Sequence, residues 1–344
     1  MGQKLSFLEE PREIIPQIWA TRKAWPPAIY FSVPGAKHYS NCYYSNRPYS
    51  FLNLSITGDA CPCRCAHCNG KLLQTMTPAR TPEEMCRLVD RLGEKGCKGI
   101  LVSGGADRSG AVPLVPFQGA IKYAKQQGLK VLVHSGLIQE ETAVCLKEAG
   151  VDQVLIDVIG HESTIREVYH LDRRPIDYLE SMITCLKIGI EMAPHVVIGL
   201  HFGHVLGEMR ALEMIQGMNP QAIVLVIFSP LSYTKMAAIV PPPIESVEMI
   251  IAKARNLNPQ TFLSLGCMKP PGKYKRRIER TAIDCGANAI AFPDELTVAY
   301  AQEKGFKIKF IEECCSSIGE PFQMAQSDLS GKEEVFMVRD PPTE

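Results

Sequence analysis

The chain has 344 residues, 46% of them hydrophobic, which suits one large α/β domain or two smaller ones with an ample core. Its 37 basic and 37 acidic side chains cancel, so we expect neither nucleic acid nor an anionic membrane as a partner. No run approaches the roughly 20 apolar residues of a membrane span, and residues 1–30 carry charges instead of an apolar signal core. Thirteen cysteines in such a chain indicate the reducing cytoplasm, where thiols are free to bind metal.

Residues 1–50 are interpreted as an N-terminal extension that holds a short apolar run over 28–33 and Cys42. A repeated unit follows, from about residue 51 to residue 293. Each unit has an amphipathic helix, a glycine that ends it, and a short run of Val, Ile and Leu that ends in small residues. In the helical segment 81–95, for example, Thr81 suits the N-cap and Pro82 the first helical position.

The apolar runs predict eight strands, and they are nearly continuous in hydrophobicity. This pattern is typical of parallel strands that are buried on both faces. Eight strand–helix units of this length predict a (β/α)8 barrel of the TIM type, with an open α/β sheet as the alternative. In such a barrel the functional residues lie at the carboxyl ends of the strands. The predicted strands cover 51–57, 99–105, 130–136, 153–160, 194–199, 222–230, 261–267 and 289–293.

The loop after the first predicted strand contains Cys61, Cys65 and Cys68 at the spacing C-x3-C-x2-C. Three closely spaced thiolates can hold three irons of a four-iron cluster and leave the fourth open to a substrate or cofactor. A structural zinc site is the alternative, but zinc prefers two separated C-x2-C pairs, and no second pair follows at that distance. Cys63 lies inside the loop but off the motif spacing, so we interpret it as a bystander.

Residues 294–344 are predicted to add one helix, a strand-like run over 306–311, the pair Cys314–Cys315 and a polar tail from about residue 325. Cys267 ends the seventh predicted strand, at the functional end of the barrel. If the two flanking segments fold over one barrel end, the gathered thiols would suit a second iron–sulfur cluster, whose ligands would be Cys42, Cys267, Cys314 and Cys315. Unrelated free thiols are the alternative.

The cysteine loop resembles the core motif of the radical S-adenosylmethionine (SAM) superfamily, in which an aromatic ring, here His67, usually precedes the last cysteine. The resemblance covers about residues 51–293. It implies that Cys61, Cys65 and Cys68 hold a [4Fe–4S] cluster whose open iron binds the amino and carboxylate groups of SAM. An electron from the cluster would then cleave the sulfonium bond and give a 5′-deoxyadenosyl radical, which removes a hydrogen from an unactivated carbon.

The same resemblance assigns cofactor contacts to several strand ends. Gly104 and Gly105 match the family's Gly-Gly position, where backbone carbonyls meet the ammonium of SAM, and glycine permits that close approach. Ser135 would be a polar contact or a capping hydroxyl, and Asp157 would bind a ribose hydroxyl or a structural partner. By its position before the next helix, Arg173 or Arg174 looks similar to the carboxylate-binding arginine of biotin synthases; surface solvation is the alternative for each.

A softer resemblance links the chain to the two-subunit lipoyl synthase of archaea and some bacteria. It rests on segments 65–73, 167–172 and 266–270 and on the Cys314-Cys315-Ser316 ending. The single-chain lipoyl synthase carries an N-terminal triple-cysteine motif that is absent here. Biotin synthase has auxiliary cysteines on mid-barrel strands, whereas strands three to five here carry none.

This resemblance implies insertion of sulfur at unactivated carbons of an octanoyl chain, with an auxiliary cluster as the sulfur donor. The implied partners are a lipoyl-domain or carrier protein bearing octanoyl-lysine, a low-potential electron donor such as ferredoxin or flavodoxin, and a second radical SAM subunit. The basic stretch Lys269–Arg280 would meet an acidic carrier or be a solvated face. The rival interpretations are a rearrangement or C-methylation enzyme without sulfur transfer, and an iron–sulfur electron-transfer protein.

Overall fold

The computed structural model describes residues 27–318, and the strands of this part form one sheet in the order β11-β1-β10-β9-β8-β7-β6-β5-β4-β2-β3. Every strand pair in the sheet is parallel. The strands are β1 Ala28–Ser32, β2 Phe51–Ser55, β3 Thr77–Pro78, β4 Gly99–Ser103, β5 Lys130–His134, β6 Gln153–Asp157, β7 Met192–Ile198, β8 Ala222–Ile227, β9 Phe262–Leu265, β10 Ala289–Ala291 and β11 Lys307–Ile311.

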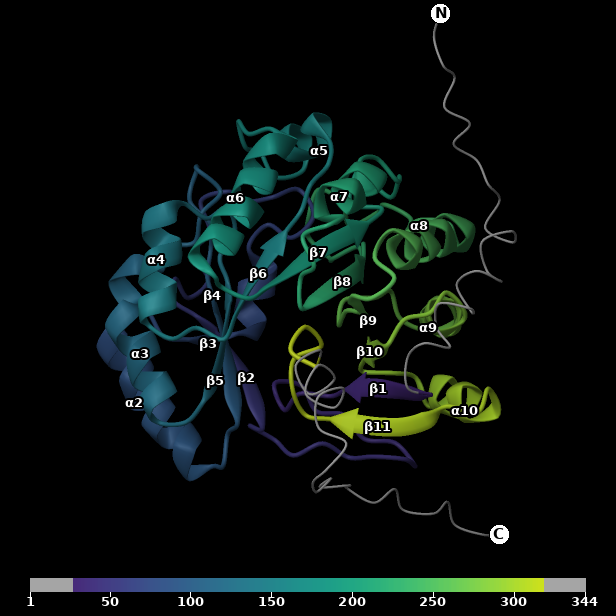
Figure 1. Ribbon diagram of the computed structural model, residues 1–344, viewed down its shortest axis with the longest axis horizontal. Coiled ribbons are helices and arrows are strands. Elements are labelled where there is room, and N and C mark those ends of the chain that lie inside the picture. The colour runs from purple at the N-terminus through teal and green to yellow at the C-terminus, as the bar shows by residue number, and fades with distance from the viewer. Residues whose placement is uncertain (1–26, 319–344) are drawn as a thin grey trace, which may run out of the picture.

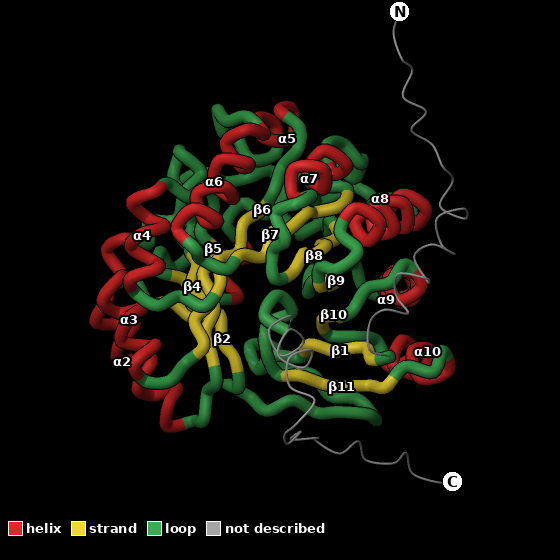
Figure 2. Tube along the Cα trace, viewed as in Figure 1, coloured by secondary structure: helices red, strands yellow, loops and turns green. Residues whose placement is uncertain are grey.

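The helices lie outside the strands, and the strands curl into a barrel (Figures 1 and 2). The predicted α/β class and TIM-type barrel are confirmed, and each of the eight predicted strands is present. The sheet stays open between β11 and β3, which are its two ends. The helices are η1 Lys71–Thr75, α2 Pro82–Glu94, η2 Val115–Phe117, α3 Gln118–Gln126, α4 Glu140–Glu148, α5 Glu162–Glu167, α6 Pro175–Ile188, α7 Glu208–Ile215, α8 Ile244–Leu257, α9 Lys273–Asp284 and α10 Glu295–Glu303.

Local sequence explains these elements. Helix α2 begins after Thr81, whose hydroxyl accepts a hydrogen bond from the Glu84 amide at 3.2 Å, and Pro82 occupies the first helical position. Its apolar stripe is buried against the sheet. No helix in residues 27–318 is both long and apolar enough to span a membrane.

The two segments that flank the repeated units extend the barrel sheet. β1, from the N-terminal extension, pairs with β10 on one side and with β11 on the other. The loop from β1 to β2 is fastened to the end of β11, because Tyr44 stacks on Phe310 and both Tyr44 and Arg47 hydrogen-bond to Glu312. The domain boundaries at residues 50 and 293 stay a prediction, and the expected tail from about residue 325 lies outside the described residues.

The amino-terminal end of the barrel is closed by side chains and by the chain that follows β11. This chain, residues 312–318, turns into the barrel and is called here the C-terminal plug. Its Glu313 carboxylate accepts from Lys130 at 2.8 Å, its Ser316 carbonyl accepts from Gln153 at 3.1 Å, and Ile318 is fully buried. Around Ile318 lies a ring of inward-facing residues: Ala28, Tyr30, Phe51, Leu132, Leu155, Ala193, Ala222, Phe262 and Ala289.

Candidate active site

The cysteine loop lies between β2 and η1, at the carboxyl end of the barrel. Cys65 and Cys68 are buried and Cys61 is half-buried. The segment after α5 holds the loop, since the Ala66 amide donates to the Val168 carbonyl at 2.7 Å. The three predicted cluster ligands therefore sit on a fixed stretch of backbone above the lumen.

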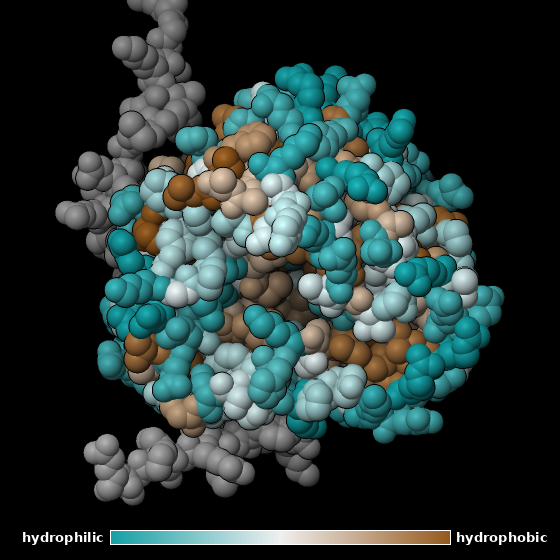
Figure 3. Space-filling model, turned by 180° about the vertical axis from the view of Figure 1, so that it is seen from behind, coloured by the Kyte–Doolittle hydropathy of each residue, from teal (hydrophilic) through white to brown (hydrophobic). Residues whose placement is uncertain are grey.

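These cysteines line a cavity of about 210 Å³. Ser103, Gly104 and Gly105 at the end of β4 line it too, as do His134 from β5 and Asp157 from β6. The space-filling view from behind Figure 1 shows a hollow at the centre of the molecule (Figure 3). Apolar side chains cover the remaining walls: Leu72, Leu73, Met76, Val112, Leu137 and Leu171.

The residues present fit an iron–sulfur cluster and its cofactor. The ligand atoms of Cys65, His67 and Cys68 lie within 4.8 Å of one another, and the buried Nδ1 of His67 has no hydrogen-bond partner. Gly105 leaves room for a close approach, because a Cβ there would lie 2.1 Å from the Ala60 carbonyl oxygen and 2.6 Å from the Cys61 Cα. Three thiolates with an open side match a cluster that keeps one iron free.

The ionisable pair His134 and Asp157 lines the same cavity as the cysteines. His134 Nε2 lies 3.5 Å from Asp157, and the Tyr169 hydroxyl donates to Asp157 at 3.3 Å. Burial alone would raise the pKa of Asp157, but the facing His134 outweighs it and lowers that pKa to about 2. Burial likewise opposes the charged form of His134, yet Asp157 raises the pKa of His134 above its ordinary value.

His195, beside this pair, has the opposite shift. Its ring centre is 5.7 Å from that of His134. Burial first, and then the neighbouring His134 charge, lower the pKa of His195 to about 4. His134 and His195 therefore differ in proton affinity, because Asp157 favours the charged form of His134 whereas burial favours the neutral form of His195.

The other predicted cofactor residues do not all reach the cavity. Gly104, Gly105 and Asp157 line it. Ser135 is buried beside it and donates to the Gly136 carbonyl at 2.9 Å. Arg173 lines a neighbouring cavity and donates to the Ser109 carbonyl at 3.0 Å, and Arg174 is the N-cap of α6. A role of Ser135, Arg173 or Arg174 in binding SAM therefore stays a prediction.

The structure brings two of the four predicted auxiliary cysteines together, and the exposed Cys267 lies within electrostatic range of that pair. Cys314 and Cys315 lie on the C-terminal plug, packed against Val224 and Ala291 of the barrel wall. A hydrogen bond from Cys315 is the main cause that lowers the pKa of Cys314 to about 6. Cys267 interacts electrostatically with both. Cys42 is exposed, and its thiol interacts with Glu295 instead.

Two residues of the site were missed in the sequence. His134 precedes Ser135, and the strand alternation Lys130, Leu132, His134 is the signal that turns it inward. Cys63, interpreted as a bystander, is buried and lines the same cavity as Cys61, Cys65 and Cys68. Spacing alone could not identify Cys63, because the family motif does not use its position.

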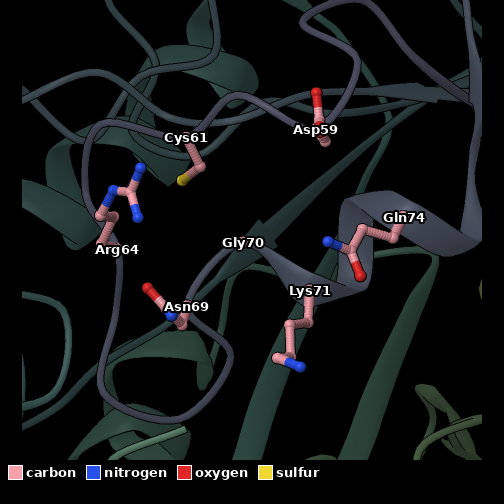
Figure 4. A pocket seen from close by; sticks show the side chains of 7 residues that line it. All are labelled: Asp59, Cys61, Arg64, Asn69, Gly70, Lys71 and Gln74. Atoms are coloured by element: carbon pink, nitrogen blue, oxygen red, sulfur yellow. The ribbon is translucent and has the colours of Figure 1, made fainter. Parts of the chain in front are cut away.

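A second depression, of about 260 Å³, lies on the outer side of the cysteine loop. Figure 4 shows the Cys61 thiol and the Arg64 guanidinium pointing into it. Cys61 and Gly70 line both this depression and the inner cavity. A cluster held by the loop would therefore be separated from the outside by little more than Cys61 itself. The other lining residues are Asp59, Asn69, Lys71 and Gln74.

Known proteins share this sequence pattern and this fold. A biotin synthase 2 from Paracoccus denitrificans is 24% identical over 263 residues, which are 72% of this chain and 78% of the relative. A biotin synthase from Prochlorococcus marinus is 28% identical over 183 residues, and the match spans only about half of each protein, 51% and 52%.

Two solved structures are similar in fold. A methylornithine synthase has a TM-score of 0.58 at 14% identity, and the match covers 88% of this chain and 90% of the neighbour. A maturase of the FeFe-hydrogenase from Carboxydothermus hydrogenoformans has a TM-score of 0.59 at 14% identity, with 89% and 74% covered.

The model of the radical SAM superfamily matches residues 55–215, which include the cysteine loop, the Gly104–Gly105 turn and Asp157. The matched residues 55–215 are therefore a radical SAM domain, and its cofactors are a [4Fe–4S] cluster and S-adenosylmethionine.

Proposed function

We propose that this enzyme inserts sulfur at unactivated carbons of an octanoyl chain that a carrier protein presents on a lysine. The observation that carries the proposal is the position of Cys314 and Cys315 on the plug inside the barrel, with Cys267 in electrostatic range of both. Thiolate ligands are the usual holders of iron–sulfur clusters, so these residues would hold an auxiliary cluster as sulfur donor. Cys42, at Glu295, would take part only if its loop moved.

His134 is close to both cysteine groups. His134 lines the cavity of the cysteine loop and also interacts electrostatically with Cys314 of the plug. When bound, the cluster and SAM supply a radical that removes hydrogen from carbon. The chain's own residues would hold the substrate between the two groups, exclude bulk water with the plug, and place the paired His134 and Asp157 on the wall.

The cavity wall supports an apolar substrate. Its upper part is lined by leucines, Met76 and Val112. Below it, Val224 and Ala291 are buried against the plug. The cations of the basic stretch Lys269–Arg280 are mostly paired: Lys269 and Lys275 with Glu279, Arg276 with Asp294, and Arg277 with Glu245. We therefore propose that the lumen, and not the basic stretch, recognises the acyl group.

Biotin synthase-type chemistry is the second candidate, because the curated relatives have that name. The inner wall of β5, β6 and β7 presents Lys130, His134, Gln153, Asp157 and His195, and it carries no cysteine. The thiols here instead come from the loop after β9 and from the plug. This different origin favours a substrate placed differently from that of biotin synthase.

Iron and sulfide content after anaerobic reconstitution tests the auxiliary cluster. We expect about eight irons in the wild type and about four in a Cys61→Ala, Cys65→Ala, Cys68→Ala triple variant. A Cys314→Ser, Cys315→Ser double variant should also hold about four. Cys97→Ala, which removes a buried thiol elsewhere, is the control and should match the wild type. About four irons in the wild type would leave the enzyme without a sulfur donor and shift the proposal to rearrangement or C-methylation.

Product analysis tests the substrate. With an octanoylated carrier, a second radical SAM subunit and a low-potential reductant, we expect thiolated octanoyl-lysine and 5′-deoxyadenosine. The Cys314→Ser, Cys315→Ser variant should still cleave SAM but give no thiolated product. Thiolation of a biotin precursor, with none of the carrier, would establish the second candidate instead.

We further propose that the electron donor binds at the outer depression beside Cys61. Arg64 and Lys71 give this surface cations, which would attract an acidic ferredoxin or flavodoxin. Arg64→Glu with Lys71→Glu should slow cluster reduction by flavodoxin and leave reduction by dithionite unchanged. Equal slowing with both reductants would show a damaged cluster and not a lost docking surface.

A further inference from the structure

We propose that Cys63 is an exchangeable fourth ligand of the SAM-binding cluster, which occupies the open iron until the cofactor displaces it. The proposal requires only the cluster and is independent of sulfur insertion. Cys63 has 8% of its surface exposed, and it shares one cavity with the three motif cysteines.

The position of Cys63 among the thiols is the first argument. This residue lies between Cys61 and Cys65 in the loop, and all three line one cavity with Cys68. Cys63 is thus one of four thiols that border the same space. Soft thiolates are the preferred ligands of iron–sulfur iron, and a tethered thiol competes at high effective concentration.

An exchangeable ligand needs an alternative partner when it is not bound to iron, and the surroundings of Cys63 provide one. Its Sγ lies 2.9 Å from the carbonyl oxygen of Asp107, in the loop that follows Gly104–Gly105. The Asp107 carboxylate fixes this loop by accepting from the amide and hydroxyl of Ser109 at 2.7 and 2.6 Å. His170 holds the Cys63 backbone, with its Nδ1 3.2 Å from the Cys63 carbonyl oxygen.

The exchange is acid–base chemistry without a change of oxidation state. When Cys63 caps the open iron, its thiol loses a proton to solvent and a sulfur–iron bond forms. When SAM binds, that bond breaks, the amino and carboxylate groups take the iron, and the Cys63 sulfur takes up a proton from solvent and returns to the Asp107 carbonyl. The cap would shield the open iron from loss while the enzyme waits for its cofactor.

Oxidative loss of the open iron tests the cap. The reconstituted holoenzyme is treated with ferricyanide, with or without SAM, and the [3Fe–4S] form is quantified by electron paramagnetic resonance. Without SAM, we expect severalfold more of this form in Cys63→Ala than in the wild type, with Cys63→Ser between them. With SAM, the three proteins should agree. Any signal from a second cluster is common to all of them and cancels in the comparison.

SAM affinity is the second readout, because the cofactor must displace Cys63 from the iron and therefore binds more weakly when Cys63 is present. If the capped form holds about nine-tenths of the molecules, Cys63→Ala should bind SAM about tenfold more tightly. Cys97→Ala, whose residue has a similar exposure of 7%, is the control and should match the wild type in both assays. Equal oxidation of Cys63→Ala and wild type would overturn the proposal. Failure of Cys63→Ala to assemble a cluster would also overturn it, because Cys63 would then be a permanent requirement.

Discussion

Gly105 shows at the residue scale how closely the cysteine loop rests on the end of β4. We expect Gly105→Ala to push the Ala60–Cys61 backbone away, because the new Cβ would lie 2.1 Å from the Ala60 oxygen. Overpacking of this kind costs about 1–3 kcal/mol, and here it falls on the metal site. In the variant, the iron content per chain should fall and the Kd for SAM should rise. Gly93→Ala is the control, because nothing lies within 4 Å of its new Cβ; equal behaviour of the two variants would contradict the prediction.

The His134–Asp157 pair gives a pH-dependent prediction. Asp157 raises the pKa of His134, so the imidazolium is stabilised below the ordinary pKa of histidine, and this contribution is lost as pH rises through the raised value. In Asp157→Asn the pKa of His134 should fall. Diethyl pyrocarbonate reacts with neutral imidazole, so mass spectrometry should find the midpoint of His134 modification at lower pH in the variant. Asp152→Asn, at a carboxylate paired with Lys125, should leave that midpoint unchanged.

The sequence predicts some of these residues and not others, for a physical reason. Cys61, Cys65, Cys68 and the Gly104–Gly105 turn are contiguous motifs, and local spacing identifies them. The contact of His134 with Asp157 depends on the pairing of β5 with β6 and on which side chains face inward. That register arises from the whole barrel, so no single segment reveals it.

At the scale of elements, a buried ion pair fixes the loop that carries Cys267. Lys269 lies 3.4 Å from Glu279 of α9, with side-chain exposures of 2% and 0%, and Lys269 also donates to the Gly266 carbonyl at 3.1 Å. Lys269→Met should cost about 3–5 kcal/mol in the free energy of unfolding by urea, because it leaves a buried carboxylate without its main partner. The double variant Lys269→Met, Glu279→Gln should recover part of this loss.

The exposed pair Arg277–Glu245 is the control for that prediction. Its side chains are 67% and 78% exposed, so Arg277→Met should cost less than about 1 kcal/mol. A similarly small cost for Lys269→Met would show that Lys275, 3.7 Å away, and the hydrogen bonds from the Asp294 amide and the Thr297 hydroxyl compensate Glu279 without Lys269.

The elements themselves were largely predictable, because each of the eight strands is a local apolar run and most of them follow a glycine stop. The strands β1 and β11 show the limit of prediction from local sequence. The apolar runs at 28–33 and 306–311 are visible in the sequence, but their parallel pairing joins residues about 280 positions apart. The burial of the following plug in the lumen has no local signal either, since Cys314–Ser317 is short and polar.

At the scale of the whole molecule, the two ends of the described chain meet beside β11 and together place the second group of thiols. Glu312 connects the two ends, because it accepts hydrogen bonds from the Tyr44 hydroxyl at 3.0 Å and from the Arg47 amide and guanidinium at 2.8 and 2.9 Å. The chain turns into the lumen directly after it. The position of Cys314 and Cys315 therefore depends on the loop between β1 and β2, more than 260 residues earlier.

We expect Glu312→Ala to loosen the plug without unfolding the barrel, because the ring around Ile318 and the Lys130–Glu313 pair remain. Local opening exposes groups in proportion to its equilibrium population, and the three lost hydrogen bonds are worth about 1–3 kcal/mol together. Alkylation of Cys314 and Cys315 in the cluster-free protein, followed by mass spectrometry, should then be at least severalfold faster than in the wild type. Cys185, which is fully buried on α6, should stay unreactive in both proteins. Glu303→Ala on the exposed surface of α10 should behave as the wild type; an unchanged rate in Glu312→Ala would mean that the lumen contacts alone hold the plug, and the N-terminal loop would then have no part in building the site.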